Sequence, residues 1–336
     1  MMEIFENGQW LPLAFALLIA VAVLVYAVLD GYDLGVGILM QYALPQEQDR
    51  MIASIGPFWD ANETWLVLAV GLLLIAFPEA NGIVLGHLYL PTCLMLLGLI
   101  VRGVSFDFRS KADVKAKGRW NRAFTGGSFL VAITQGYMVG SYILGFEKGV
   151  GPLLFCLMTG LFVAAAYSLI GAAWLIMKTD GALQKKAIAW AGTALKGTAA
   201  GIALVSITTP LASAHVLARW TTFPDAFILA PLPLIVLGLV AGLRYCLKRL
   251  SHAPTIRQWR PFAMTVGLFL TSLIALAYSF YPYIIPGQLK IVDAASAPES
   301  LMIILVGALI VLPLLIGYTF FAYKVFHGKA DELSYN

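Results

Sequence analysis

The feature that most constrains this chain is a recurrence of apolar runs long enough to cross a lipid bilayer. A membrane-spanning helix needs about 20 mostly apolar residues, and nine such stretches follow one another with short polar connections. We therefore predict an all-α integral membrane protein, a bundle of about nine transmembrane helices in which 1–336 form a single polytopic domain. The predicted spans lie near 11–40, 55–77, 82–105, 122–144, 152–177, 187–211, 226–247, 262–283 and 300–325.

The composition agrees with this class. Hydrophobic residues make up 60% of the chain and charged residues 12%, whereas about 25% of residues are charged in a soluble domain. Cys93, Cys156 and Cys246 are isolated within apolar runs, which favours small hydrophobic side chains over disulfides or metal ligands. The opening residues carry no Lys or Arg before the first apolar run, so we expect that run to stay as a membrane helix rather than be cleaved as a signal peptide.

The basic residues predict the orientation. Eighteen of the 22 Lys and Arg residues fall in connections on one side of the predicted bundle, three fall on the other, and Lys196 lies inside a span. Because cytoplasmic loops are enriched in Lys and Arg, we expect a periplasmic N-terminus and a cytoplasmic C-terminus. The basic run at 109–122 is explained by the same rule, with anionic lipid as its one expected contact and no nucleic-acid binding.

Acidic side chains gather in two predicted spans, near their cytoplasmic ends. The segments are "LDGYDLGVG" (29–37) and "GPFWDANETWLV" (56–67). Their acids are Asp30, Asp33, Asp60 and Glu63, and we expect Arg102 and Lys196 at a similar depth. Because ionisable residues inside membranes mark ion or proton paths, this pattern predicts a proton-conducting element entered from the cytoplasm. Gly31 and Gly35 add a small-residue face for close helix packing.

A purely structural interpretation of these acids stays open. Acids in the first turn of a helix interact favourably with its dipole, and Trp59 and Trp65 suit interfacial anchors. Asp30 and Asp33 suit the end of a span in the headgroup region, or a pairing with Arg102.

Motifs for other chemistries are absent from the sequence. It contains no HxxxH, ExxH, CxxC, GxGxxG or Walker loop, so nothing supports a metal, nucleotide or flavin site. Haem ligation inside a bundle needs histidine. His87 and His215 are both expected near the outer side, which leaves a bis-histidine haem as an alternative to two surface histidines.

Five ordered blocks resemble subunit II of the bacterial cytochrome bd-type quinol oxidases, in the short form of the cyanide-insensitive branch. They are the two acidic segments above and "RGVSFDFRSK" (102–111), "TQGYMVG" (134–140) and "FYPYIIP" (280–286). Ala61 stands where this family often has Gly, and Tyr32 where Phe is common.

The resemblance implies one subunit of an electrogenic heterodimeric oxidase, in a bacterial inner membrane, that passes electrons from quinol to O₂ and forms water. It implies that the haems, two b-type and one d-type or all b-type, and the quinol site belong to subunit I. This chain is then expected to ligate no haem or metal itself and to stabilise the haem site of its partner. A bound lipid or quinone and a small accessory subunit remain open.

The resemblance also assigns roles to residues. Asp60 is expected to be a proton-path carboxyl facing subunit I, Trp59 and Trp65 to line the path and border an O₂ route, and Arg102 and Asp107 to form a structural ion pair. The other residues expected on the proton path or beside the haem site are Asp30, Asp33, Asn62 and Glu63.

Two alternatives of other classes remain at this stage. Intramembrane acids together with a lysine also suit a proton-coupled secondary transporter. A stand-alone di-haem cytochrome would use His87 and His215.

Overall fold

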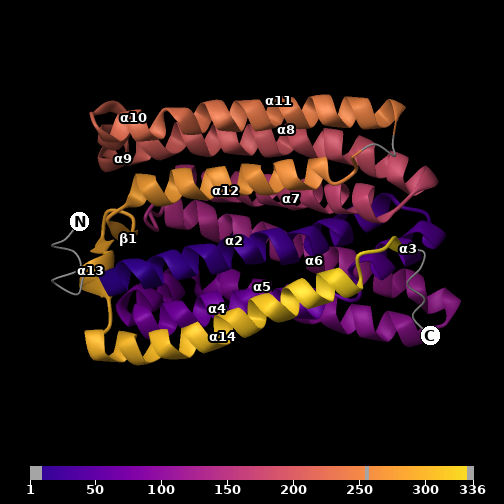
Figure 1. Cartoon of the computed structure of the whole chain (residues 1–336), viewed down its shortest axis with the longest axis horizontal. Coiled ribbons are helices and arrows are strands. Elements are labelled where there is room, and N and C mark those ends of the chain that lie inside the picture. Colours follow the sequence, from indigo (N-terminus) through magenta and orange to yellow (C-terminus); the bar gives the residue numbers. More distant parts are fainter. Residues whose placement is uncertain (1–9, 254–256, 331–336) are drawn as a thin grey trace.

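The structure, a computed structural model, describes residues 10–253 and 257–330. Long helices lie side by side along one axis and form most of the molecule (Figure 1). The long helices are α2 (Trp10–Leu39), α4 (Trp59–Ala76), α5 (Pro78–Lys111), α6 (Val114–Ile143), α7 (Val150–Lys178), α8 (Gly181–Ala212), α11 (Pro231–His252), α12 (Arg260–Phe280) and α14 (Pro298–Val325).

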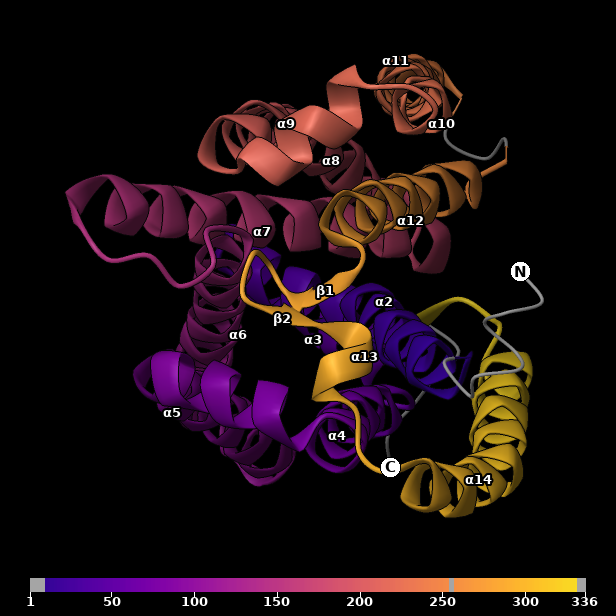
Figure 2. The ribbon, with the colours of Figure 1, turned by 90° about the vertical axis from the view of Figure 1, so that its left-hand side faces the viewer.

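Short elements close the two ends of this bundle. One end, which we call the α3 end, carries the turn and helix that follow α2; the other, the hairpin end, carries the β-hairpin and the connections around it (Figures 1 and 2). The short elements are η1 (Met40–Tyr42), α3 (Pro45–Ile55), α9 (Ala214–Thr221), α10 (Asp225–Leu229), β1 (Tyr283–Ile285), β2 (Leu289–Lys290) and α13 (Ile291–Ala294). The helix ends joined by the connections α5–α6, α7–α8 and α11–α12 all lie at the α3 end (Figure 1), so the segments richest in Lys and Arg share one end.

Each predicted span coincides with a helix of the structure. Eight helices in the described part of the chain are long and apolar enough to cross a membrane, and α6 is not among them. Its apolar part holds many Gly, Ser, Thr and Gln residues, which lower hydropathy but suit a helix packed against other helices. The all-helical membrane class is confirmed, and the count of nine spans stays a prediction.

Helix α2 lies at the centre of the bundle and packs against α4, α6 and α7. Its glycines allow this contact. A Cβ atom on Gly35 would lie 1.8 Å from the carbonyl oxygen of Tyr167, and one on Gly31 would lie 2.9 Å from the ring of the same tyrosine. The small-residue face predicted for this segment is therefore the face on which α2 meets α7.

Glycines of the TQGYMVG segment make a similar contact between α6 and α7. A Cβ atom on Gly136 would lie 2.6 Å from the Cα of Gly160, and one on Gly140 would lie 3.0 Å from the Cα of Cys156. Close backbone approach at these positions fixes the register of the two helices and so the direction of the side chains between them.

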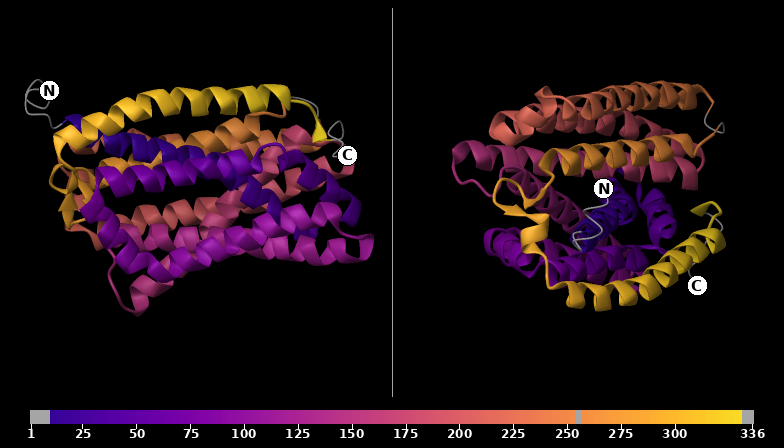
Figure 3. Two further views of the ribbon diagram at one scale, coloured as in Figure 1. Left: turned by 90° about the horizontal axis from the view of Figure 1, so that it is seen from below. Right: turned by 60° about the vertical axis from the view of Figure 1, so that its left-hand side comes forward.

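Helix α14 crosses the outside of the bundle and packs loosely (Figure 3). Only Leu301 and Ala322 of its residues are buried. At the α3 end it is held by Lys178 of α7, whose Nζ donates hydrogen bonds to the carbonyl oxygens of Phe326 (2.6 Å) and Gly328 (3.1 Å). Most of the surface of α14 is thus apolar and faces outward, as expected of a helix against lipid or another membrane subunit.

Candidate functional site

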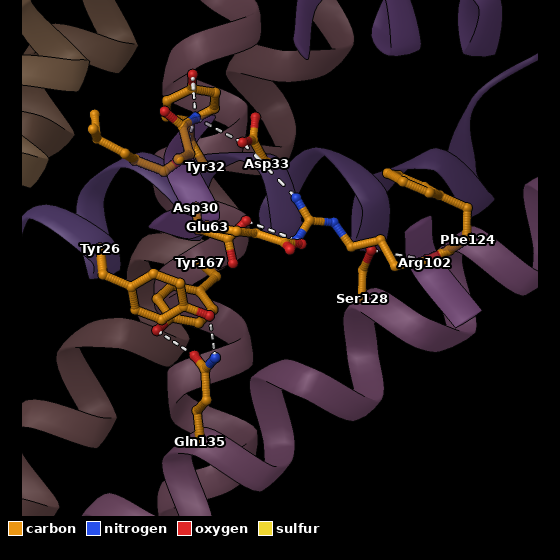
Figure 4. Close-up of polar contacts among 12 residues, drawn as sticks. Tyr26, Asp30, Tyr32, Asp33, Glu63, Arg102, Phe124, Ser128, Gln135 and Tyr167 are labelled. Atoms are coloured by element: carbon orange, nitrogen blue, oxygen red, sulfur yellow. Dashed lines mark hydrogen bonds and ion pairs between the residues drawn. The ribbon is translucent and has the colours of Figure 1, made fainter. Parts of the chain in front are cut away.

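A cluster of buried ionisable side chains lies where α2, α4 and α5 meet. We call it the acid–arginine cluster; its members are Asp30, Asp33, Glu63 and Arg102. Nη1 of Arg102 lies 2.7 Å from Oδ1 of Asp30 and 2.8 Å from Oε1 of Glu63, and Nη2 lies 3.9 Å from Oδ2 of Asp33 (Figure 4). The side chains of Asp30, Asp33 and Arg102 are 0% exposed, whereas that of Glu63 is 27% exposed.

The helical repeat explains this convergence. Asp30 and Asp33 are three residues apart on α2 and so lie on one face, the face turned toward α4 and α5. The guanidinium of Arg102 presents a planar fork of donors, so it can contact several carboxyl groups at once. Of the two structural alternatives for Asp30 and Asp33, the structure shows the pairing with Arg102: the contact of Asp30 is close, and Asp33 lies at the edge of ion-pair distance.

The cluster contains more negative than positive groups. Three carboxyls surround one guanidinium among the described residues. Oδ2 of Asp30, Oδ1 of Asp33 and Nε of Arg102 are buried without a hydrogen-bond partner in the described chain. Burying an unpaired charge or an unsatisfied polar atom is costly, and the excess negative charge is relieved when carboxyls take up protons. The arrangement can therefore hold and exchange protons.

Asn62 of α4 extends the cluster toward α14. Its Nδ2 donates hydrogen bonds to Oδ2 of Asp33 (2.8 Å), the hydroxyl of Tyr32 (2.9 Å) and the carbonyl of Leu29 (3.3 Å). The hydroxyl of Tyr323 donates to Oδ1 of Asn62 at 3.3 Å and lies 2.5 Å from the hydroxyl of Tyr32. A continuous polar chain thus runs from the cluster to the inner side of α14.

A second polar chain lies on the other side of Asp30, toward the hairpin end. We call it the tyrosine–glutamine triad: Tyr26 of α2, Gln135 of α6 and Tyr167 of α7. Gln135 is hydrogen-bonded to both tyrosines, at 2.5 Å and 2.7 Å (Figure 4). All three side chains are buried. Sequence reasoning missed this group and Tyr323, because their side chains are uncharged and come from distant segments; the spacing of Tyr26 and Asp30, one turn apart on one face, was the available signal.

The structure separates Asp60 from the cluster. Asp60 is exposed at the start of α4, while Asn62 and Trp65 on the same helix are buried. Trp59 lies beside the cluster, with the guanidinium of Arg102 5.8 Å from its ring centroid. Glu63 lies between these positions, and it is the cluster member that reaches the surface.

The expected ion pair between Arg102 and Asp107 is wrong. Asp107 is exposed, and within the described part of the chain the ion pairs of Arg102 are those with Asp30, Asp33 and Glu63. Five residues along an α-helix correspond to a rotation of about 140°, so the two side chains point in different directions. Lys196, expected at the same depth as the cluster, is exposed on α8.

An apolar groove runs between α14 and the helices behind it. Its volume is about 610 Å³. It is lined by Leu18, Val21, Ala22, Val25, Leu29, Trp65, Leu68, Trp174, Met177, Phe262, Leu312, Ile316, Thr319, Phe320 and Tyr323. Tyr323 and Leu29 also belong to the polar chain of Asn62, so the groove borders the extension of the cluster.

No described residues form a metal centre of three or more His, Cys, Asp or Glu side chains. His87 stacks on Phe146 and His215 packs against Tyr283, so each ring has its own aromatic neighbour.

The comparisons with known proteins agree with this architecture. A family model described as cytochrome bd terminal oxidase subunit II matches residues 11–326. The chain belongs to this family.

Individual relatives show how far the similarity extends. Cytochrome bd ubiquinol oxidase subunit 2 of Bacillus subtilis is 28% identical over 340 residues, which cover 94% of this chain and 96% of that protein. Cytochrome bd-I ubiquinol oxidase subunit 2 of Escherichia coli is 31% identical over 208 residues, which cover 57% of this chain and 55% of that protein.

A chain in the structure of bd oxidase from Geobacillus thermodenitrificans has the same fold, with a TM-score of 0.78 over 94% of this chain and 98% of that one, at 16% identity. This subunit II is accordingly a multi-pass helical protein of a bacterial inner membrane.

Proposed function

We propose that this subunit II works with a haem-bearing subunit I in a quinol:oxygen oxidoreductase, and that its acid–arginine cluster delivers protons to the site of O₂ reduction. Family membership supports the first part. The second part rests on the three carboxyls gathered around Arg102 at the meeting point of α2, α4 and α5. Reduction of O₂ to water consumes protons, and a buried group with excess carboxyls is suited to supply them.

The exposure of the cluster suggests how protons pass. Glu63 is part buried and contacts Arg102, so it connects the surface with the buried pair Asp30 and Asp33. Asp60 lies nearby on the exposed side of α4, where it would face the partner subunit or collect protons from water. Trp59 and Trp65 border this route, and their rings limit the entry of water.

The apolar groove suits a lipid acyl chain or the isoprenoid tail of a quinone, because its lining is almost wholly hydrophobic. A bound chain of this kind would join α14 to the bundle, and the same apolar surface beside Trp65 would allow O₂ to approach. The haems, the quinol-oxidising site and any small accessory subunit belong to the partners in this proposal.

Replacement of Glu63 by Gln in the purified complex tests the proton role. The amide keeps the shape of the side chain but cannot exchange a proton, so we expect quinol-dependent O₂ uptake to fall at least about tenfold with the haem spectrum unchanged. Glu147→Gln is the matched control, since Glu147 is an exposed carboxyl near the hairpin end.

Two results would contradict the proposal. Turnover within twofold of the parent, at full haem content, would remove Glu63 from the path, and loss of haem would indicate an assembly role instead. A chain that purifies from its membrane without a haem-bearing partner would refute the oxidase assignment and return attention to the transporter alternative, which no observation in the structure favours.

A further inference from the structure

The tyrosine–glutamine triad touches the cluster but has no part in the route described above. Tyr26, Gln135 and Tyr167 come from three different helices, and their side chains are 5%, 8% and 6% exposed, respectively. A buried polar network of this kind is retained at a cost unless every member is satisfied. Because the triad lies beside Asp30, we expect it to act on that carboxyl.

The amide of Gln135 gives the triad a direction. A glutamine side chain accepts through its oxygen and donates through its nitrogen. Here Oε1 accepts from the hydroxyl of Tyr167 at 2.7 Å, and Nε2 donates to the hydroxyl oxygen of Tyr26 at 2.5 Å. Because the oxygen of Tyr26 is occupied as an acceptor, its own hydrogen remains free to be donated elsewhere.

Asp30 offers an acceptor for this hydrogen. Tyr26 precedes Asp30 by four residues on α2, so the two side chains share one face of the helix and lie next to each other in Figure 4. Oδ2 of Asp30 is buried and accepts no hydrogen bond in the described chain. A hydrogen donated by Tyr26 to that oxygen would complete an order of donors from Tyr167 through Gln135 and Tyr26 to Asp30.

We propose that Gln135 is a positioning residue of the oxidase, which holds the Tyr26 hydroxyl so that it donates to Asp30 whenever that carboxyl is ionised. This inference rests on the proposed role of the acid–arginine cluster in proton delivery. The titratable groups around Asp30 among the described residues are Asp33 and Tyr26 of α2, Glu63 of α4, Arg102 of α5, Tyr167 of α7 and Tyr323 of α14; α6 contributes the neutral Gln135.

The test uses the purified complex and the pH profile of quinol-dependent O₂ uptake. A hydrogen bond to an ionised carboxyl favours its charged form, and Gln135→Leu releases the Tyr26 hydroxyl that would make this bond. We expect the profile to move upward by about one pH unit. Tyr26→Phe should produce the same shift, and the double variant should shift no further, because Gln135 acts only through Tyr26.

Two further variants separate positioning from general damage. Thr134→Val alters the neighbouring buried residue of α6, whose hydroxyl, among the described residues, donates to carbonyls of its own helix, and should leave the profile in place. If Gln135→Leu does not assemble, Tyr167→Phe removes one of the two bonds of the amide and should give a smaller shift of the same sign. Infrared redox difference spectra, with the carboxyl band assigned by Asp30→Asn, report on Asp30 even where another step limits turnover.

The outcomes distinguish this inference from the proposal on which it rests. If Asp30→Asn leaves turnover and pH profile unchanged, the cluster does not deliver protons and both statements fail. If Asp30→Asn slows turnover but Gln135→Leu moves neither the profile nor the carboxyl band, the role of Gln135 is overturned and the proton path stands. Shifts that add in the double variant would likewise overturn it.

Discussion

Removal of the positive charge of Arg102 tests directly what holds the acid–arginine cluster together. Arg102→Met keeps much of the length of the side chain but removes the guanidinium, and with it the contacts to Asp30 at 2.7 Å and to Glu63 at 2.8 Å. Taking one partner from a buried ion pair costs about 3–5 kcal/mol, since the other charge stays buried without compensation. Three carboxyls would be left in this condition.

Proton uptake limits that cost and gives it a pH dependence. An Asp side chain is ionised in water at pH 7, and keeping it protonated at that pH costs about 4 kcal/mol. This cost falls by about 1.4 kcal/mol for each unit that the pH falls. A folded variant that holds protons binds more of them than the unfolded chain does, so its stability decreases as the pH rises. We expect the free energy of unfolding of Arg102→Met to lie about 4 kcal/mol below that of the parent at pH 7. At pH 6 this difference should be smaller by about 1.4 kcal/mol for each proton held.

The assay is the thermal unfolding midpoint of the detergent-purified complex, followed by tryptophan fluorescence at pH 6, 7 and 8. Arg122→Met is the control, because Arg122 is an exposed arginine at the same end of the bundle. Glu63→Gln added to Arg102→Met should recover part of the loss, since it removes one uncompensated carboxyl. A deficit that is equal at pH 6 and pH 8, or no larger than that of the control, would refute the charge-balance reasoning.

Three other expectations concern packing, a surface ion pair and α14. Gly35→Ala should reduce the yield of assembled complex and lower its stability by about 1–3 kcal/mol through overpacking against α7. Gly71→Ala is the control and should leave both unchanged, because an added Cβ atom there would meet nothing within 4 Å. Equal yields of the two variants would contradict the contact of Gly35 with α7. Burial raises the pKa of Glu47, but the hydrogen bonds from Lys186 and from the backbone amide of Leu44, together with the charge of Lys186, outweigh it and leave the pKa below the ordinary 4.5. This stabilising contribution is present above pH 4.5 and is lost as the pH falls further, so Lys186→Met should cost about 0.5 kcal/mol at pH 7 and nothing well below pH 4, measured by thermal unfolding; a difference that persists at low pH would argue against the pair. Tyr323→Phe removes the hydroxyl that joins α14 to the polar chain, at a cost in stability of about 1 kcal/mol. Amide hydrogen exchange in the adjacent half of α14 should then become faster. Unchanged protection from exchange would show that other contacts hold the helix.

The sequence predicted the helices because length and hydropathy are local properties. Helix α6 is the instructive case, since its TQGYMVG segment is too polar for a lipid-facing span. Its glycines meet the backbone of α7 and its Gln135 bonds to two tyrosines. Hydropathy describes what a helix shows to lipid, and it is a weaker signal for a helix that packs mainly against protein.

Helical periodicity could have ranked the acids of α4 better. Its buried residues, Asn62, Trp65, Ala69, Leu72 and Ala76, recur every three or four positions. Two residues correspond to about 200° of rotation, so Asp60 falls on the side of the helix opposite Asn62, and Glu63 falls on the flank of the buried face. The preference for Asp60 came from a family resemblance, which records residue type but not which side chains this chain buries.

The partners of Arg102 and the members of the triad depended on tertiary structure. Asp30 and Arg102 are 72 residues apart in the sequence, and Tyr26, Gln135 and Tyr167 come from three helices. A neutral side chain in an apolar run gives no sign of whether it meets another one. Charge marked the general place of the site, and helix packing determined which residues complete it.

The first part of α2 is wholly apolar, and this affects how a membrane voltage can be maintained. From Trp10 to Val25 this helix carries no ionisable side chain and no side-chain amide or hydroxyl, and the polar chain begins only at Tyr26. In the proposed orientation, a proton that enters the cluster from the cytoplasm finds no polar step along α2 toward the far side. Moving one charge across a potential of 100 mV is worth about 2.3 kcal/mol. A continuous polar path would let protons flow back across the membrane and dissipate this energy. The apolar start of α2 would let an oxidase draw protons from one compartment while the voltage that it builds is kept.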